Sequence, residues 1–134
     1  MDKKYKILII DDEEEICRYT KSLLEKTGKF QAMTSTKGVE GLEMAKANSP
    51  DLILLDILLP DMDGSDVAAR LFEEEATSKI PVIFMTALAK NDDMENGSGK
   101  IGGRFFMPKP INPKDLISRI ESILDLGYRP APRL

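Results

Sequence analysis

Short runs of apolar residues alternate along the chain with longer segments in which apolar residues recur every three or four positions. The runs are typical of buried strands, and the longer repeats are typical of helices with one apolar face. Strands are predicted at residues 5–10, 30–34, 52–55, 82–85 and 105–107. Helices are predicted at residues 14–27, at 37–48 behind a cap at Ser35 or Thr36, behind a cap at Ser65, and from Pro113 behind a cap at Asn112.

The alternation of strands and helices predicts an α/β fold, in which a five-stranded parallel sheet has helices on both faces. Right-handed crossovers make a doubly wound sheet the simplest arrangement. Residues 52–55 read Leu-Ile-Leu-Leu, as expected for a central strand buried on both faces, yet this strand ends at Asp56. In doubly wound sheets ligands bind beyond the carboxyl ends of the strands, so this acid is a candidate site residue.

Reactive side chains follow four of the five predicted strands: Asp11, Asp12, Asp56, Thr86 and Lys109. Because the carboxyl ends of parallel strands meet at one edge, we expect them to converge. Clustered carboxylates repel one another unless a cation lies among them, and a chain with no His and one Cys offers mainly oxygen ligands, which favours Mg²⁺. A carboxylate can attack phosphorus, while hydroxyl and ammonium groups bind phosphoryl oxygens. The set therefore predicts a site that carries a phosphoryl group on an aspartate.

Each of these residues also has an ordinary interpretation. An acidic pair after a strand is often a helix cap, and a Thr after a strand or a Lys-Pro before a helix is commonplace. Asp61 and Asp63 in the stretch Pro-Asp-Met-Asp-Gly are interpreted as turn residues. The functional interpretation depends on the conjunction of five residues at strand ends.

Composition narrows the class of protein. The 134 residues carry a net charge of −4, which gives no basic surface for nucleic acid or for a membrane, and no apolar run is long enough to span a bilayer. The single cysteine, Cys17, excludes an internal disulfide, fits a cytoplasmic protein and is expected to be a buried apolar residue.

Four stretches together resemble the CheY-like receiver domain of bacterial two-component response regulators: I-L-I-I-D-D-E, L-I-L-L-D-I-L-L-P-D-M-D-G, P-V-I-F-M-T-A and F-F-M-P-K-P. The resemblance covers about residues 4 to 126, so residues 1–127 are expected to form the receiver domain and 128–134 a tail or truncated linker. It implies the flavodoxin-like strand order 2-1-3-4-5. It also implies a cis peptide bond between Lys109 and Pro110.

The resemblance implies a role for each candidate residue. Asp56 matches the phosphoacceptor, and Mg²⁺ is held by Asp11, Asp12, Asp56 and the backbone carbonyl of Leu58. Thr86 and Lys109 match the residues that bind phosphoryl oxygens. Thr86 and Phe106 match the switch pair, in which the aromatic ring turns inward after phosphorylation.

The implied function is that of a phosphoacceptor switch rather than an enzyme. The phosphoryl group comes from a sensor histidine kinase or a phosphotransfer protein, since the chain has no His of its own. The output partner is unknown, and we expect no direct contact with nucleic acid or membrane and a monomer before phosphorylation. Leu58 and Leu88 are apolar at positions that flank the attacking water in the family, which predicts a long-lived phosphoryl group.

Two other classes of protein are considered. A metal-dependent phosphatase that forms an aspartyl phosphate typically needs a second acid two places after the nucleophile, where this chain has Leu58. A flavodoxin-like binding module would need a phosphate-binding loop of Gly, Ser and Thr after the first strand, where this chain has Asp-Asp-Glu-Glu-Glu.

The segment before the fifth strand is rich in glycine. Gly97, Gly99, Gly102 and Gly103 fall within seven residues, and each interior Gly costs a helix roughly 1 kcal/mol relative to Ala. We therefore predict that the fourth helix of the family is weak or short here, with at most a helical turn at residues 92–96 followed by a loop.

Overall fold

The computed structural model describes residues 4–87, 100–101 and 104–125. Its elements are β1 (Tyr5–Ile10), α1 (Glu14–Glu25), β2 (Phe30–Ser35), α2 (Gly38–Asn48), β3 (Leu52–Asp56), α3 (Gly64–Glu73), β4 (Val82–Thr86), β5 (Lys100–Ile101), β6 (Arg104–Pro108) and α4 (Pro113–Asp125). All five predicted strands and all four predicted helices are present, with ends within a few residues of the expected ones. Among the described helices, none has the length and apolar character needed to cross a bilayer.

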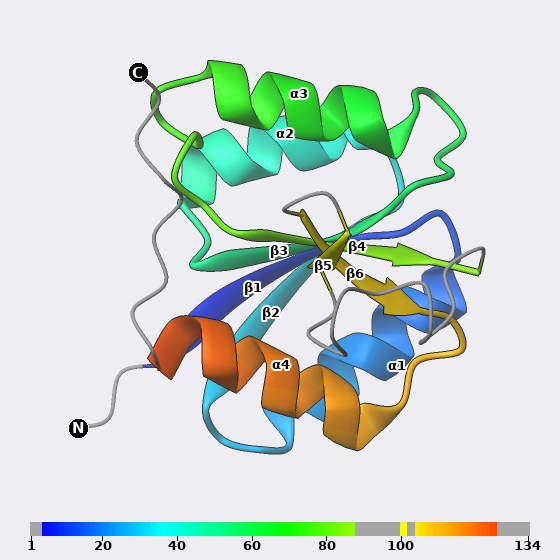
Figure 1. Ribbon diagram of the computed structural model, residues 1–134, viewed down its shortest axis with the longest axis vertical. Coiled ribbons are helices and arrows are strands. Elements are labelled where there is room, and N and C mark those ends of the chain that lie inside the picture. The colour runs from blue at the N-terminus through cyan, green and yellow to red at the C-terminus, as the bar shows by residue number, and fades with distance from the viewer. Residues whose placement is uncertain (1–3, 88–99, 102–103, 126–134) are drawn as a thin grey trace.

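The strands form one sheet in the order β2-β1-β3-β4-β6-β5 (Figure 1). The first five are parallel neighbours, which confirms the doubly wound order 2-1-3-4-5, with β6 as the fifth parallel strand. The two-residue strand β5 adds an antiparallel pairing at the edge of β6. The predicted glycine loop is therefore wrong at residues 100–101, which pair with Arg104 and Phe105 of β6 through backbone contacts. The predicted turn at residues 92–96 and Leu88 lie outside the described residues.

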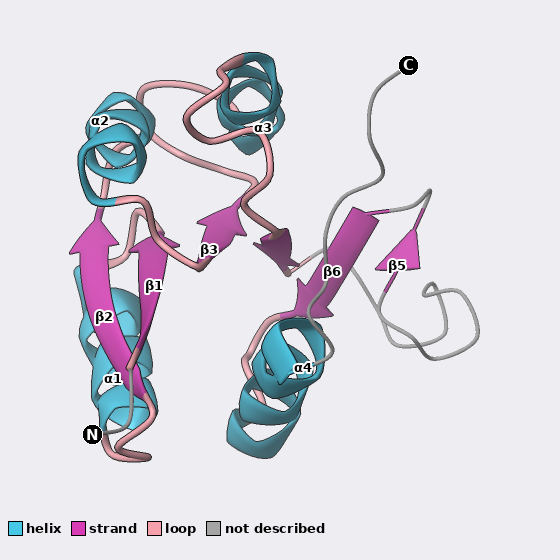
Figure 2. Cartoon of the chain, turned by 90° about the vertical axis from the view of Figure 1, so that its left-hand side faces the viewer, coloured by secondary structure: helices cyan, strands magenta, loops and turns pink. Residues whose placement is uncertain are grey.

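Helices cover both faces of the sheet, with α1 and α4 on one face and α2 and α3 on the other (Figure 2). Successive strand side chains point to opposite faces, so Ile7 and Ile9 pack toward α1 and α4, while Leu8 and Ile10 pack toward α2 and α3. The four apolar residues of β3 are 0% exposed, as predicted for a central strand. The core thus immobilises the strands at whose carboxyl ends the candidate residues stand.

The helix starts agree only in part with the expected caps. At α4 the side chain of Asn112 accepts a hydrogen bond from the Asp115 N–H at 3.1 Å, as predicted. At α3 the prediction of Ser65 as the cap is wrong, because the helix begins at Gly64, two residues earlier than expected, and Asp63 occupies the cap position.

The cap of α2 comes from a distant part of the chain. The hydroxyl of Ser35 or Thr36 was expected to cap this helix. Ser35 Oγ accepts the Lys37 N–H at 3.2 Å, but the first two helical N–H groups, those of Gly38 and Val39, donate to the carboxylate of Asp61 at 2.8 and 3.0 Å. Asp61 lies in the loop between β3 and α3. A residue interpreted as a turn former therefore links two elements of the fold.

Candidate functional site

The carboxyl ends of the parallel strands bring the candidate residues to one edge of the sheet. Asp11 follows β1 directly, Asp56 and Thr86 end β3 and β4, and Lys109 follows β6. The register pairs Asp56 with Met85 on β4, and the Lys109 N–H donates to the Thr86 carbonyl at 3.0 Å. Segments almost a hundred residues apart in sequence thus meet at this edge.

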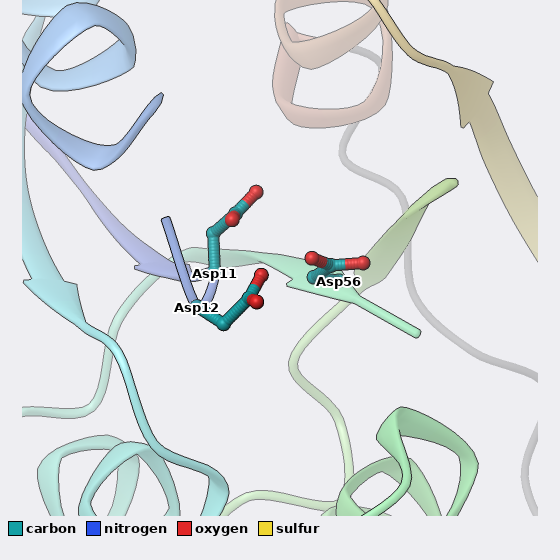
Figure 3. Close-up of side chains that lie close together, drawn as sticks. All are labelled: Asp11, Asp12 and Asp56. Carbon is teal, nitrogen blue, oxygen red and sulfur yellow. The ribbon is translucent and has the colours of Figure 1, made fainter. Parts of the chain in front are cut away.

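Three carboxylates face one another at the centre of the site (Figure 3). Asp11, Asp12 and Asp56 each offer an oxygen, and these oxygens lie within 4.8 Å of one another. Asp11 is 0% and Asp56 6% exposed, whereas Asp12 is exposed. Burial, and then the hydrogen bond and charge of Asp56, raise the pKa of Asp12 above its usual value. The cluster therefore favours a cation and leaves one carboxylate accessible to it.

Lys109 supplies a positive charge within the cluster. Its ammonium nitrogen lies 2.8 Å from Asp11 Oδ2, in an ion pair without ordinary hydrogen-bond geometry, and donates to Asp56 Oδ2 at 3.1 Å. Burial acts to lower the pKa of Lys109, but the charges of Asp11 and Asp56 and the hydrogen bond to Asp56 outweigh it and raise that pKa. Glu13 adds a fourth carboxylate 3.8 Å from the ammonium, so the site keeps a net negative charge that a divalent cation would reduce.

The backbone after Asp56 is tightly folded. The Gly64 N–H donates to the Ile57 carbonyl at 2.7 Å, and the Leu58 N–H donates to Asp56 Oδ1 at 3.2 Å. A Cβ on Gly64 would lie 2.4 Å from the Asp56 carbonyl oxygen, so this position requires glycine. Leu58 is 64% exposed beside the site. The sequence showed Gly64 only as part of a turn motif, and its closeness to Asp56 became visible in the fold.

The ring of Phe106 is half-buried and stacks on Phe84 with a centroid distance of 5.2 Å, a contact that does not test its expected role in the switch. Two other expectations are confirmed. The Lys109–Pro110 peptide bond is cis, as the resemblance implied. Cys17 is buried, as predicted, and its thiol donates to the Asp11 carbonyl at 3.3 Å. This last contact was not foreseen, because nothing in the sequence spacing places α1 against the end of β1.

Comparison with known proteins identifies the family of this chain. Residues 7–121 match the family model of the response regulator receiver domain. The chain belongs to this family. It is 34% identical over 128 residues to the alkaline phosphatase synthesis transcriptional regulatory protein PhoP of Bacillus subtilis, covering 95% of this chain and 51% of that protein. It is also 34% identical over 119 residues to the DNA-binding dual master transcriptional regulator RpaA of Synechocystis sp., covering 89% of this chain and 48% of that one.

Solved structures share the same architecture. The response regulator receiver domain protein (CheY-like) of Methanospirillum hungatei superposes with a TM-score of 0.76 at 30% identity, covering 92% of this chain and 96% of that one. This receiver domain spans about half the length of the curated relatives described above. Receiver domains of response regulators are signalling proteins and generally bind Mg²⁺, and the three-carboxylate cluster here could hold such an ion.

Proposed function

We propose that this receiver domain is a phosphoacceptor switch in which Asp56 receives a phosphoryl group from a phosphohistidine of a sensor kinase or phosphotransfer protein. The observation that carries the proposal is the setting of Asp56. It is a nearly buried carboxylate at a strand end, 3.1 Å from the ammonium of Lys109 and next to two further acids. A potential nucleophile, a cation for phosphoryl oxygens and a metal-binding acid pair thus share one edge of the sheet.

In the transfer step, an oxygen of Asp56 forms a bond to phosphorus while the bond from phosphorus to the donor nitrogen breaks. Asp11, Asp12, Asp56 and the Leu58 carbonyl are the groups that would hold Mg²⁺, which when bound neutralises charge on the phosphoryl oxygens. Lys109 already lies beside Asp56 and would bind one of those oxygens. Thr86, at the end of the neighbouring strand, would bind another through its hydroxyl.

The phosphorylated state would differ from the present one at two contacts. A phosphoryl dianion on Asp56 is a stronger partner for Lys109 than a carboxylate, so it draws Lys109 and Thr86 toward itself. Phe106, which now stacks on Phe84 of β4, would turn into the space that Thr86 leaves. The surface around β6 is then the surface that an output partner reads.

The proposal also includes the extent of the domain, its partner and its state before phosphorylation. In this proposal residues 1–127 form the switch, residues 128–134 are a tail or linker, and the output partner is an unknown protein or domain. The domain is expected to be monomeric before phosphorylation and to act in the cytoplasm. We assign it no catalytic turnover of an external substrate, because its phosphoryl group ends on its own side chain.

Intact mass spectrometry after incubation with acetyl phosphate and Mg²⁺ tests the proposal. The parent should gain the mass of one phosphoryl group, and Asp56→Asn should gain none. Asp66→Asn, an exposed acid of α3, is the matched control and should behave as the parent does. Continued labelling of Asp56→Asn at Asp11 or Asp12 would defeat the assignment.

A further inference from the structure

The loop that follows the phosphoacceptor is held at both of its ends. At its start the Ile57 N–H donates to the Met85 carbonyl at 3.4 Å, and at its end the Gly64 N–H donates to the Ile57 carbonyl at 2.7 Å. Leu58 and Asp63 form an isolated antiparallel bridge between these ends. These contacts fix only the ends of the loop, so the position of its middle, residues 59–62, depends on other contacts.

The middle of the loop is attached to the start of α2. Both oxygens of Asp61 accept helix N–H groups, from Gly38 at 2.8 Å and Val39 at 3.0 Å, while Lys37 at the cap position makes no side-chain cap of its own. The next loop residue, Met62, lies so close to Gly38 that a Cβ there would be 2.5 Å from Met62 Cγ. The loop and the helix start are thus joined by two hydrogen bonds and by direct packing.

The start of α2 is in turn joined to the other acidic strand end. The Ser35 carbonyl, just before α2, accepts the Asp11 N–H at 3.0 Å. The hydrogen bonds from Val39 and Gly38 stabilise the ionised carboxylate of Asp61 and hold its pKa below the usual value. A continuous set of contacts therefore runs from the end of β1, through the start of α2, to the loop after β3.

We propose that Asp61 is a positioning residue for the metal site. By fastening the loop to α2, it sets where Leu58 presents its carbonyl and how far the end of β3 lies from Asp12. This inference rests on the proposed function, in which Asp12 and the Leu58 carbonyl hold Mg²⁺. Asp61 touches neither the metal nor the phosphoryl group.

The test compares Asp61→Ala and Asp61→Asn with Asp63→Asn. The control removes the same charge from the same loop, but its side chain makes no cap hydrogen bond. Mg²⁺ affinity is measured by calorimetry, and phosphorylation by acetyl phosphate is measured as a function of Mg²⁺ concentration. Asp61→Ala should bind Mg²⁺ about tenfold more weakly than the control, as is usual when an outer support of a metal ligand is lost.

Saturating Mg²⁺ separates positioning from general damage to the fold. A positioning role predicts that Asp61→Ala regains the control's rate of phosphorylation at saturating Mg²⁺, and that Asp61→Asn, whose amide oxygen can accept one of the two hydrogen bonds, has intermediate affinity. If Asp61→Ala does not fold, Asp61→Asn decides by the same criterion.

Two failures can be told apart. If the Asp61 variants bind Mg²⁺ as tightly as Asp63→Asn does, Asp61 only caps α2 and the inference is overturned. This holds whether or not the variants are less stable than the parent. A parent protein that neither binds Mg²⁺ nor becomes phosphorylated would overturn the proposed function and this inference together.

Discussion

Replacing Lys109 with methionine removes the only ammonium within the cluster of acids that the structure describes, while keeping most of the side-chain volume. The ammonium lies 2.8 Å from Asp11 and 3.1 Å from Asp56, and its side chain is 14% exposed. At an effective dielectric constant of about 20, each contact attracts by roughly 5 to 6 kcal/mol. Loss of hydration offsets much of this attraction in the intact site, but the variant leaves buried carboxylates facing each other without compensation.

Removing one partner of a buried ion pair costs about 3 to 5 kcal/mol. Since Lys109 keeps some solvent contact, we expect the free energy of unfolding of Lys109→Met to fall by about 3 kcal/mol at pH 7 without Mg²⁺. For a chain of this size that loss lowers the Tm by about 10 °C. Adding Mg²⁺ should stabilise the variant more than it stabilises the parent, because the ion replaces the missing positive charge.

Urea unfolding followed by far-UV circular dichroism, in EDTA and in Mg²⁺, measures both effects. Lys29→Met is the control, because Lys29 is 64% exposed and pairs with Glu121 at the surface, where the loss should stay below about 1 kcal/mol. A loss in Lys109→Met no larger than in the control, or an equal effect of Mg²⁺ on variant and parent, would refute the reasoning.

Three further predictions concern neighbouring positions. Gly64→Ala should lower the free energy of unfolding by about 1 to 3 kcal/mol, measured by urea unfolding, because its Cβ would meet the backbone of Asp56. Leu58→Asn should shorten the lifetime of the phosphorylated protein, followed by intact mass, because an amide can hold a water that leucine cannot; an unchanged lifetime would contradict this. Burial raises the pKa of the Cys17 thiol from 9.0 to about 11, so its contribution to stability is complete below pH 9 and is lost as the pH rises toward 11. Stability measured across this range should decline less in Cys17→Ala than in the parent.

The candidate residues at the strand ends could be predicted because each stands at a boundary that local pattern makes visible. An apolar run such as 52–55 is typical of a buried strand, so the polar residue that ends it is conspicuous, and parallel topology brings such ends together. The same logic located Asp11 and Thr86. The confirmed cap at Asn112 is equally local, since its partner is three residues away.

The predictions that were wrong concern contacts that could not be inferred from neighbouring residues. The cap of α2 was sought in Ser35 and Thr36, because capping signals are read from adjacent residues, yet the group that occupies those N–H donors is Asp61, more than twenty residues away. Lys100–Ile101 was expected to lie in a loop because glycines flank it, but glycine argues only against a helix, and these two residues pair with β6 as a strand.

The sequence by itself determined the class of fold, the order of its elements and the identity of the chemical groups at the sheet edge, because apolar periodicity and residue type act locally. Only the tertiary structure decided the distances among those groups, including the position of Lys109 between Asp11 and Asp56 and the link from Asp61 to α2. Such distances arise from the packing of whole elements against one another, which no local stretch of sequence contains.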